Sequence, residues 1–228
     1  MLILALDTAM AACSVAVWRD GTTLAARREE MARGQAEALV PMIREVMAEA
    51  GVAWAELDRV AVTIGPGSFT GLRVGLATAR ALTVAAGTPV VGVTTTEALA
   101  AAVDPAQRAG RRVLAAVDSK RDDLFLQWFD ADLAPLGPPC SAEPQAVRAQ
   151  LAEGPAVIVG DAAELLAPLP ETAVAVAPDG ATVTPDPSVV AALTAVRPLP
   201  AATPQALYIR PPDAALPSGG GQLRPDLP

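Results

Sequence analysis

The chain has 228 residues, of which 52% are hydrophobic and only 3% aromatic, and its formal net charge is −8 at pH 7. This length and hydrophobic content suffice for a large core built mainly from Ala, Val and Leu, and they exclude a disordered chain. The acidic excess disfavours nucleic acid as a direct ligand, so any RNA is expected to be held mainly by another protein.

Histidine is absent, and the two cysteines, Cys13 and Cys140, lie far apart. The first fact excludes Ser–His–Asp and Cys–His catalysis and every His-ligated metal site. The second predicts two buried, reduced thiols with no disulfide. The apolar start has no basic leader and is interrupted by Asp7, and no run of about 18 uncharged apolar residues follows, so we expect a cytoplasmic protein with no membrane contact.

The first elements form a β-meander. Residues 2–7 are an apolar run that fits a strand buried on both faces. A second strand over 13–18 is followed by Asp20-Gly21, a strong hairpin signal before a third strand. Helical periodicity then extends over residues 34–50 and is expected to end at Gly51.

The next elements alternate between strand and helix. Residues 59–65 read as a buried strand, and the glycine-rich stretch 65–82 as a turn that leads into a helix. A short strand follows, and Thr94 with Glu97 forms a capping box for another helix. The order β-β-β-α-β-α-β-α predicts an α/β domain with a mixed sheet.

The remaining half is expected to repeat this pattern with shorter elements, because nineteen of the 22 prolines lie from residue 105 onward. Strands are predicted to end near Asp118 and to span 123–130 and the start of 156–166, where Asp161 is the expected N-cap of a helix. The predicted organisation is an N-terminal subdomain over 1–104, a smaller Pro/Ala-rich one over 105–210, and a flexible tail over 211–228.

The glycine-rich stretch permits a functional and a structural interpretation. Its loop residues are Gly65, Pro66, Gly67, Ser68 and Thr70. A strand that leads through glycines to a helix N-terminus can bind an anion. The spacing matches neither a dinucleotide fingerprint nor a P-loop, and Pro66 removes one N–H donor, so a nucleotide cradle is disfavoured. Ser68 or Thr70 is expected to cap the helix.

Two helices carry more apolar surface than a single sheet face requires, which favours a helix-mediated partner interface over ordinary core packing. On the second helix, small residues at intervals of four predict a groove that another helix can approach. The predicted interface consists of Leu39, Met42, Ile43 and Val46 on the first helix and Gly71, Leu72, Arg73, Gly75, Leu76, Ala79 and Arg80 on the second.

Carboxylates at strand ends allow a competing hypothesis. Asp7, with Thr8, and Asp118 follow strands, where an actin-like ATPase or small-molecule kinase keeps its phosphate and Mg²⁺ ligands. Turn formation is the simpler interpretation for both aspartates, and Asp122 and Asp123 are expected to be solvated.

The stretch GPGSFTGLRVGLATARAL, with LALDTA and CSVAV before it, resembles the TsaB (YeaZ) family. EALVPMI, VDSKRDDLF and LYIR extend this resemblance, which covers most of residues 1–130 and returns near Leu207. It implies an actin-like (ASKHA, RNase H-like) fold of two subdomains, the second one reduced. It also implies a non-catalytic subunit of the bacterial machinery for threonylcarbamoyladenosine in tRNAs that read ANN codons.

By this resemblance the chain pairs with TsaD, which holds the metal and the transferase chemistry, and joins the ATPase TsaE in the full complex. The chain itself would have no catalytic residue, metal or cofactor, and would meet tRNA only indirectly. Gln35, Ala36 and Leu39 stand in the region where the catalytic paralogue has its metal-binding histidines. A homodimer is expected when the chain is alone. A peptidase activity, sometimes attributed to the family, is disfavoured by the absence of histidine.

Overall fold

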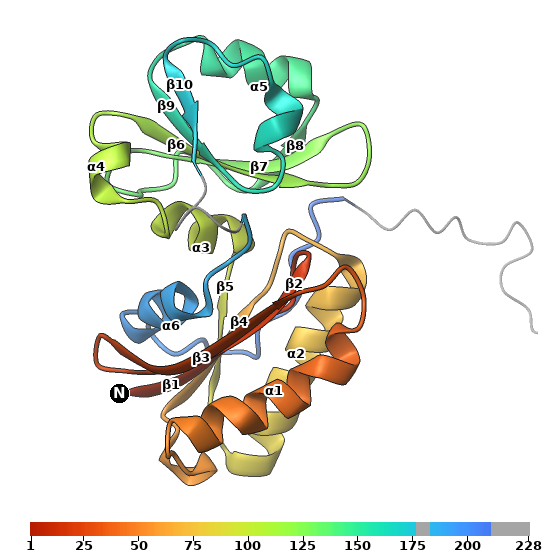
Figure 1. The fold of residues 1–228 in the computed structure, drawn as a ribbon, viewed down its shortest axis with the longest axis vertical. Helices are drawn as coiled ribbons and strands as arrows, with labels where there is room; N and C mark the ends of the chain where they lie inside the picture. The colour runs from red at the N-terminus through yellow and green to blue at the C-terminus, as the bar shows by residue number, and fades with distance from the viewer. Residues whose placement is uncertain (177–182, 211–228) are drawn as a thin grey trace, which may run out of the picture.

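The computed structural model describes residues 1–176 and 183–210. They form two five-stranded mixed sheets, one above the other along the long axis of the molecule, as Figure 1 shows.

The first sheet begins with the predicted meander. It contains β1 (Leu2–Asp7), β2 (Ala12–Arg19), β3 (Thr22–Glu30), β4 (Arg59–Thr63) and β5 (Val90–Val93), in the spatial order β3-β2-β1-β4-β5. The β2–β3 hairpin turns at Asp20 and Gly21, both of which have positive φ. β1 is buried over its whole length, as predicted, because it lies at the centre of the sheet between β2 and β4.

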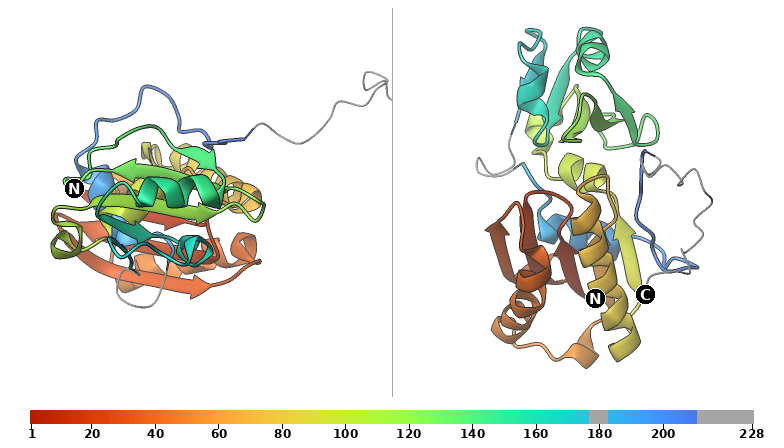
Figure 2. Two further views of the ribbon diagram at one scale, coloured as in Figure 1. Left: turned by 90° about the horizontal axis from the view of Figure 1, so that it is seen from above. Right: turned by 90° about the vertical axis from the view of Figure 1, so that its right-hand side faces the viewer.

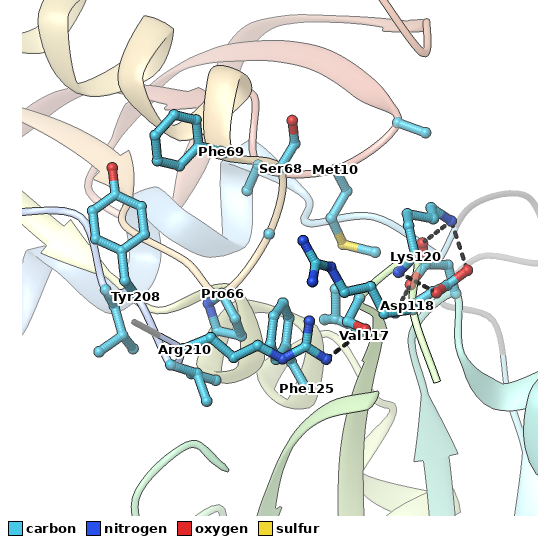
Figure 3. A pocket seen from close by; sticks show the side chains of 18 of the residues that line it. Met10, Pro66, Ser68, Phe69, Val117, Asp118, Lys120, Phe125, Tyr208 and Arg210 are labelled. Carbon is cyan, nitrogen blue, oxygen red and sulfur yellow. Dashed lines mark hydrogen bonds and ion pairs between the residues drawn. The ribbon is translucent and has the colours of Figure 1, made fainter. Parts of the chain in front are cut away.

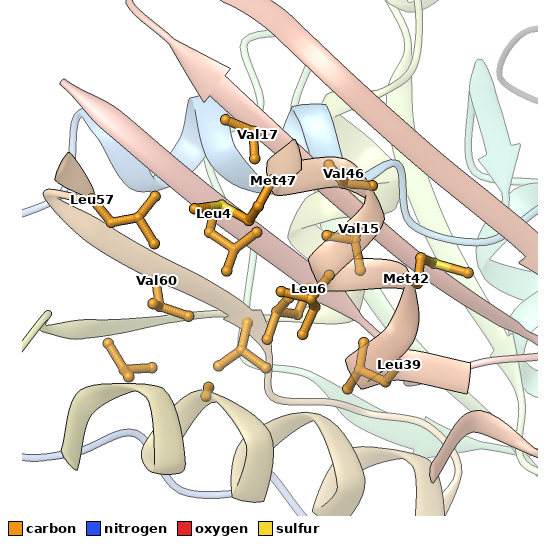
Figure 4. Close-up of a cluster of buried hydrophobic side chains, with 14 of the residues drawn as sticks. Leu4, Leu6, Val15, Val17, Leu39, Met42, Val46, Met47, Leu57 and Val60 are labelled. Atoms are coloured by element: carbon orange, nitrogen blue, oxygen red, sulfur yellow. The ribbon is translucent and has the colours of Figure 1, made fainter. Parts of the chain in front are cut away.

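Alternate residues of β1 face two different hydrophobic layers. Leu2, Leu4 and Leu6 belong to the core beneath helices α1 (Gln35–Glu49) and α2 (Phe69–Ala86), which is shown in Figure 4. Ile3 and Ala5 belong to the layer that contacts helix α6 (Pro187–Ala195) on the opposite face. The sheet is therefore covered on both faces, as its apolar strands require.

The second sheet repeats the topology of the first. Its strands are β6 (Arg112–Asp118), β7 (Leu124–Phe129), β8 (Cys140–Ala142), β9 (Ala156–Val159) and β10 (Ala173–Ala175), in the spatial order β8-β7-β6-β9-β10. In each sheet the first three strands in chain order form antiparallel pairs. The fourth strand pairs parallel with the first, and the fifth pairs parallel with the fourth.

The repeated unit is smaller in the second half. Helix α5 (Pro144–Leu151) has the place that α1 has in the first half. Where the first half has the 18-residue α2, the second has the four-residue 3-10 helix η2 (Ala163–Leu166). Asp161 does not cap this helix, contrary to the prediction, because its carboxylate accepts a hydrogen bond from the backbone N–H of Asp118 instead.

Two helices cross between the halves. α3 (Thr95–Ala101) follows β5 but packs mainly on β6, whereas α6 follows the second sheet and packs on β1 and β2 of the first. The capping box of Thr94 and Glu97 is present as predicted. The helical segments α4 (Pro105–Arg108) and η1 (Trp54–Glu56) complete the described elements. The division after residue 104 thus needs correction, because 187–195 belongs with the first sheet.

Residues 203–210 run along the side of the molecule from the first sheet towards the second, as Figure 2 shows. The N–H of Leu207 donates to the carbonyl of Ile64 at 2.7 Å, and the guanidinium of Arg210 forms an ion pair with Asp123 beyond β6. We name this stretch the C-terminal segment. The tail predicted over 211–228 lies outside the described residues.

Three smaller features complete the fold. Cys13 is buried, but Cys140 is exposed at the start of the edge strand β8, which corrects the expectation of two buried thiols. Asp122 is exposed, whereas Asp123 is half-buried beside Arg210. Across residues 1–176 and 183–210, no helix combines the length and hydrophobicity needed to span a bilayer.

Candidate functional site at the junction of the two sheets

The glycine-rich loop packs against the chain's own backbone. Ser68 caps α2 as predicted, its hydroxyl accepting from the N–H of Gly71 at 3.3 Å. A Cβ on Gly71 would lie 2.0 Å from the carbonyl oxygen of Thr8, and one on Gly67 would lie 2.3 Å from that of Ala9. The glycines therefore let α2 approach the turn after β1, and the backbone of Thr8 and Ala9 fills the space where a Cβ would lie.

The burial of the two long helices corrects the predicted partner interface. Nine of its members are buried under α1 and α2 within this chain: Leu39, Met42, Ile43, Val46, Gly71, Leu72, Gly75, Leu76 and Ala79. The two remaining members, Arg73 and Arg80, are exposed. The first sheet is wider than the apolar stripe of one helix. The additional apolar side chains of α1 and α2 therefore pack against this sheet and between the two helices.

A cavity of about 730 Å³ lies where the two sheets meet, and Figure 3 shows its walls. The turn after β1 contributes Met10, and the glycine-rich loop with the first two turns of α2 contributes residues 66–69 and Arg73. The second sheet adds Val117 and Phe125, and the C-terminal segment closes a further side. The cavity is thus assembled from segments far apart in sequence.

The acidic side chains of the cavity are held by one lysine. The ammonium of Lys120 lies 2.8 Å from Asp118 and 3.6 Å from Asp161. Burial alone would raise the pKa of Asp118, but hydrogen bonds from Lys120 keep it below its usual value. Burial raises the pKa of Asp161, against the hydrogen bond that its carboxylate accepts from the backbone N–H of Asp118. The ammonium of Lys120 is therefore the shared counter-ion of both carboxylates.

Two arginine–aromatic pairs border the same cavity. The guanidinium of Arg73 lies 3.5 Å from the ring centroid of Phe69 and donates to the hydroxyl of Tyr208 at 3.1 Å. The guanidinium of Arg210 lies 5.4 Å from the ring centroid of Phe125. Rings and guanidinium groups at such distances attract each other and fix each other's orientation.

Asp7 is not among the residues that line the cavity. It is fully buried, and its Oδ1 accepts hydrogen bonds from the hydroxyl of Thr63 at 2.6 Å and the N–H of Ala9 at 3.2 Å. Its Oδ2 has no hydrogen-bond partner in the described part of the chain. Burial raises the pKa of Asp7 to about 6 despite these hydrogen bonds.

Sequence reasoning missed the aromatic and basic lining of the cavity. Phe69, Phe125 and Tyr208 carry no motif, and they meet only because α2, β7 and the C-terminal segment converge. The segment LYIR was singled out by resemblance alone. Within the described ranges, no group of three His, Cys, Asp or Glu side chains could hold a metal ion.

Comparisons with known proteins agree with this architecture. The family model described as TsaD, tRNA N6-adenosine threonylcarbamoyltransferase, matches residues 28–134. The chain is 36% identical to the tRNA threonylcarbamoyladenosine biosynthesis protein TsaB of Escherichia coli over 132 residues, which are 58% of this chain and 56% of that protein. It is 35% identical to an uncharacterized protein of Mycobacterium bovis over 164 residues, 71% of this chain and 72% of the other.

A solved structure from Pseudomonas aeruginosa, described as similar to the peptidase YeaZ, superposes with a TM-score of 0.74 at 28% identity and covers 92% of this chain and 99% of its own. Two sheets of like topology with exchanged helices define the chain as an actin-like α/β protein. It belongs to the TsaB (YeaZ) family. The matched region spans little more than half the length of its E. coli relative named TsaB.

Proposed function

We propose that the chain is a non-catalytic subunit that pairs with a TsaD-type transferase during the biosynthesis of threonylcarbamoyladenosine in tRNA. The observation that carries the proposal is the family relationship, because relatives named TsaB are described as proteins of this biosynthesis. In this proposal TsaE joins the assembled complex, tRNA is held mainly by the other subunits, and the chain works in the cytoplasm without a cofactor of its own for the reaction.

The state of the carboxylates supports this role over that of an actin-like phosphotransferase. A phosphotransferase needs carboxylates that are open to Mg²⁺ and substrate at the ends of its strands. Here Asp7 is fully buried, and Asp118 and Asp161 share Lys120. The peptidase alternative gains no support, because the sequence has no histidine.

The outer surfaces of α1 and α2 are the best candidates for the partner interface. Small and apolar side chains at helical spacing are exposed there, and basic side chains lie among them. Val40, which is 51% exposed, and Val84, which is 88% exposed, are the largest of the apolar ones. We name the outer face of α1 and α2 the outer helix face, and it consists of Val40, Arg44, Ala48, Ala77, Arg80, Ala81 and Val84.

The function can be tested by reconstitution with purified TsaD, TsaE, the threonylcarbamoyl adenylate and a tRNA that reads ANN codons. The chain alone is expected to be inactive, and modification by the mixture is expected to require it. Full modification without the chain, or threonylcarbamoyl transfer by the chain alone, would contradict the proposal.

The outer helix face is tested by Ala77→Glu. Glutamate is a good helix former and residue 77 is exposed, so the melting temperature is expected to stay close to that of the wild type. Burial of an unpaired carboxylate at an interface should weaken the complex with TsaD about 30-fold or more, as measured by calorimetry.

The matched control is Ala149→Glu, at an exposed position of α5 on the second sheet. It should leave the affinity unchanged. Equal affinities for the two folded variants would remove the outer helix face from the interface.

A further inference from the structure

The cavity between the sheets has the size and lining of a small-molecule site. Its volume of about 730 Å³ falls within the range of pockets that enclose small organic ligands, about 300–1,000 Å³. Apolar atoms of Met10, Pro66 and Val117 form much of the wall, and three aromatic rings stand around it. Such a lining favours a ligand with a flat, apolar ring.

One basic side chain of the wall favours an anion. Lys120 is paired with Asp118 and Asp161, and Arg210 is paired with Asp123. Arg73 forms no ion pair with an acidic side chain in the described part of the chain, since its contacts are with Phe69 and Tyr208.

The positive charge of Arg73 lies near the N-terminal end of α2, at the wall of the cavity. It lies on the second turn of α2, an 18-residue helix whose first turn, with Ser68 and Phe69, also borders the cavity. The partial positive charge of this helix end adds to that of the guanidinium. An anionic group placed there would have the aromatic rings of Phe69 and Tyr208 beside it.

We infer that this cavity is a binding site for a small organic monoanion, a planar ring joined to one carboxylate group, with the anion at Arg73 and the ring among the aromatic side chains. A metal-bound triphosphate is the less suitable ligand, because Lys120 already lies between the carboxylates that a magnesium ion would need. The site is separate from the outer helix face and does not rest on the proposed function.

Titration calorimetry of the whole chain with indole-3-acetate, indole-3-acetamide and acetate tests the class of ligand. Indole-3-acetate carries the ring and the single charge, so it should bind with a dissociation constant below about 1 mM. The neutral amide, which keeps the ring, should bind at least tenfold more weakly, and acetate should not bind. Equal binding of acid and amide would overturn the anion assignment. Binding of ATP with Mg²⁺ and not of indole-3-acetate would overturn the ligand class, and no binding of any probe would overturn the site.

The position of the anion is tested by Arg73→Met, which keeps an apolar stem over Phe69 and removes the charge. Binding of indole-3-acetate should weaken tenfold or more. Arg80→Met is the matched control, since Arg80 is exposed on the same helix and also donates to the C-terminal segment, but it does not line the cavity. An equal effect of both variants would overturn the assignment. If Arg73→Met does not fold, Tyr208→Leu, at a half-exposed position, serves as the second variant, and unchanged binding would contradict the site.

Discussion

Replacement of Gly71 by alanine is expected to lower the free energy of unfolding by about 3 kcal/mol, although alanine is the better helix former by about 1 kcal/mol. The new Cβ would lie 2.0 Å from the backbone carbonyl oxygen of Thr8, and the hydroxyl of Thr8 donates back to the carbonyl of Gly71 at 2.7 Å. Neither partner can move without a shift of the turn after β1. The clash therefore outweighs the gain in helix propensity.

Urea denaturation of the wild type and two glycine variants measures this effect. Gly137→Ala is the matched control, because a Cβ there meets no atom within 4 Å and its backbone does not have positive φ. It should change stability by less than about 0.5 kcal/mol. If Gly71→Ala were as stable as Gly137→Ala, α2 would not be held against the turn as the structure places it.

Asp7→Asn is expected to stabilise the protein, and more so as the pH rises. The pKa of Asp7 is about 6 in the folded chain, whereas that of an unperturbed aspartate is 3.8. Between these values the folded chain binds more protons than the unfolded chain, so the stability of the wild type falls as pH rises. This pKa shift corresponds to a loss of about 3 kcal/mol in the stability of the wild type at high pH. The asparagine variant does not titrate at this position and keeps that stability.

Stability measured at pH 4 and pH 8 therefore separates the two proteins. The variant should be close to the wild type at pH 4 and more stable by about 3 kcal/mol at pH 8. Thr63→Val provides an independent test. In the wild type the hydroxyl of Thr63 donates a hydrogen bond to Asp7, which lowers the pKa of Asp7, and the substitution removes this hydroxyl. It should raise that pKa further and cost more stability at pH 8 than at pH 4. A stability difference between Asp7→Asn and the wild type that does not depend on pH would contradict the burial of this carboxyl.

The strands and long helices could be predicted because their signals are local. The apolar run of β1, the Asp20-Gly21 turn and the Thr94–Glu97 capping box each lie within a few residues, and the structure has all three. The sequence indicated only vaguely that the second sheet repeats the topology of the first. The reason is that β8 and β10 are three residues long, which is too short for a recognisable strand pattern.

The site could not be predicted from local patterns, because burial depends on what the fold places opposite a residue. Leu39 and Leu76 looked like surplus apolar surface, yet both are buried beneath the first sheet. The spacing of Gly71 and Gly75 indicated close approach correctly, but not that Thr8 is the group approached. The cavity depends on Phe69, Phe125 and Tyr208, which no sequence window contains together.

Size-exclusion chromatography with light scattering, on the chain alone and mixed with TsaD from the same organism, tests whether the chain is a TsaD-binding subunit. We expect a homodimer alone that converts to a one-to-one complex in the mixture, and we expect Ala77→Glu to remain folded but to elute apart from TsaD. Absence of a complex with the wild type under every nucleotide condition would contradict the proposed role as a TsaD-binding subunit.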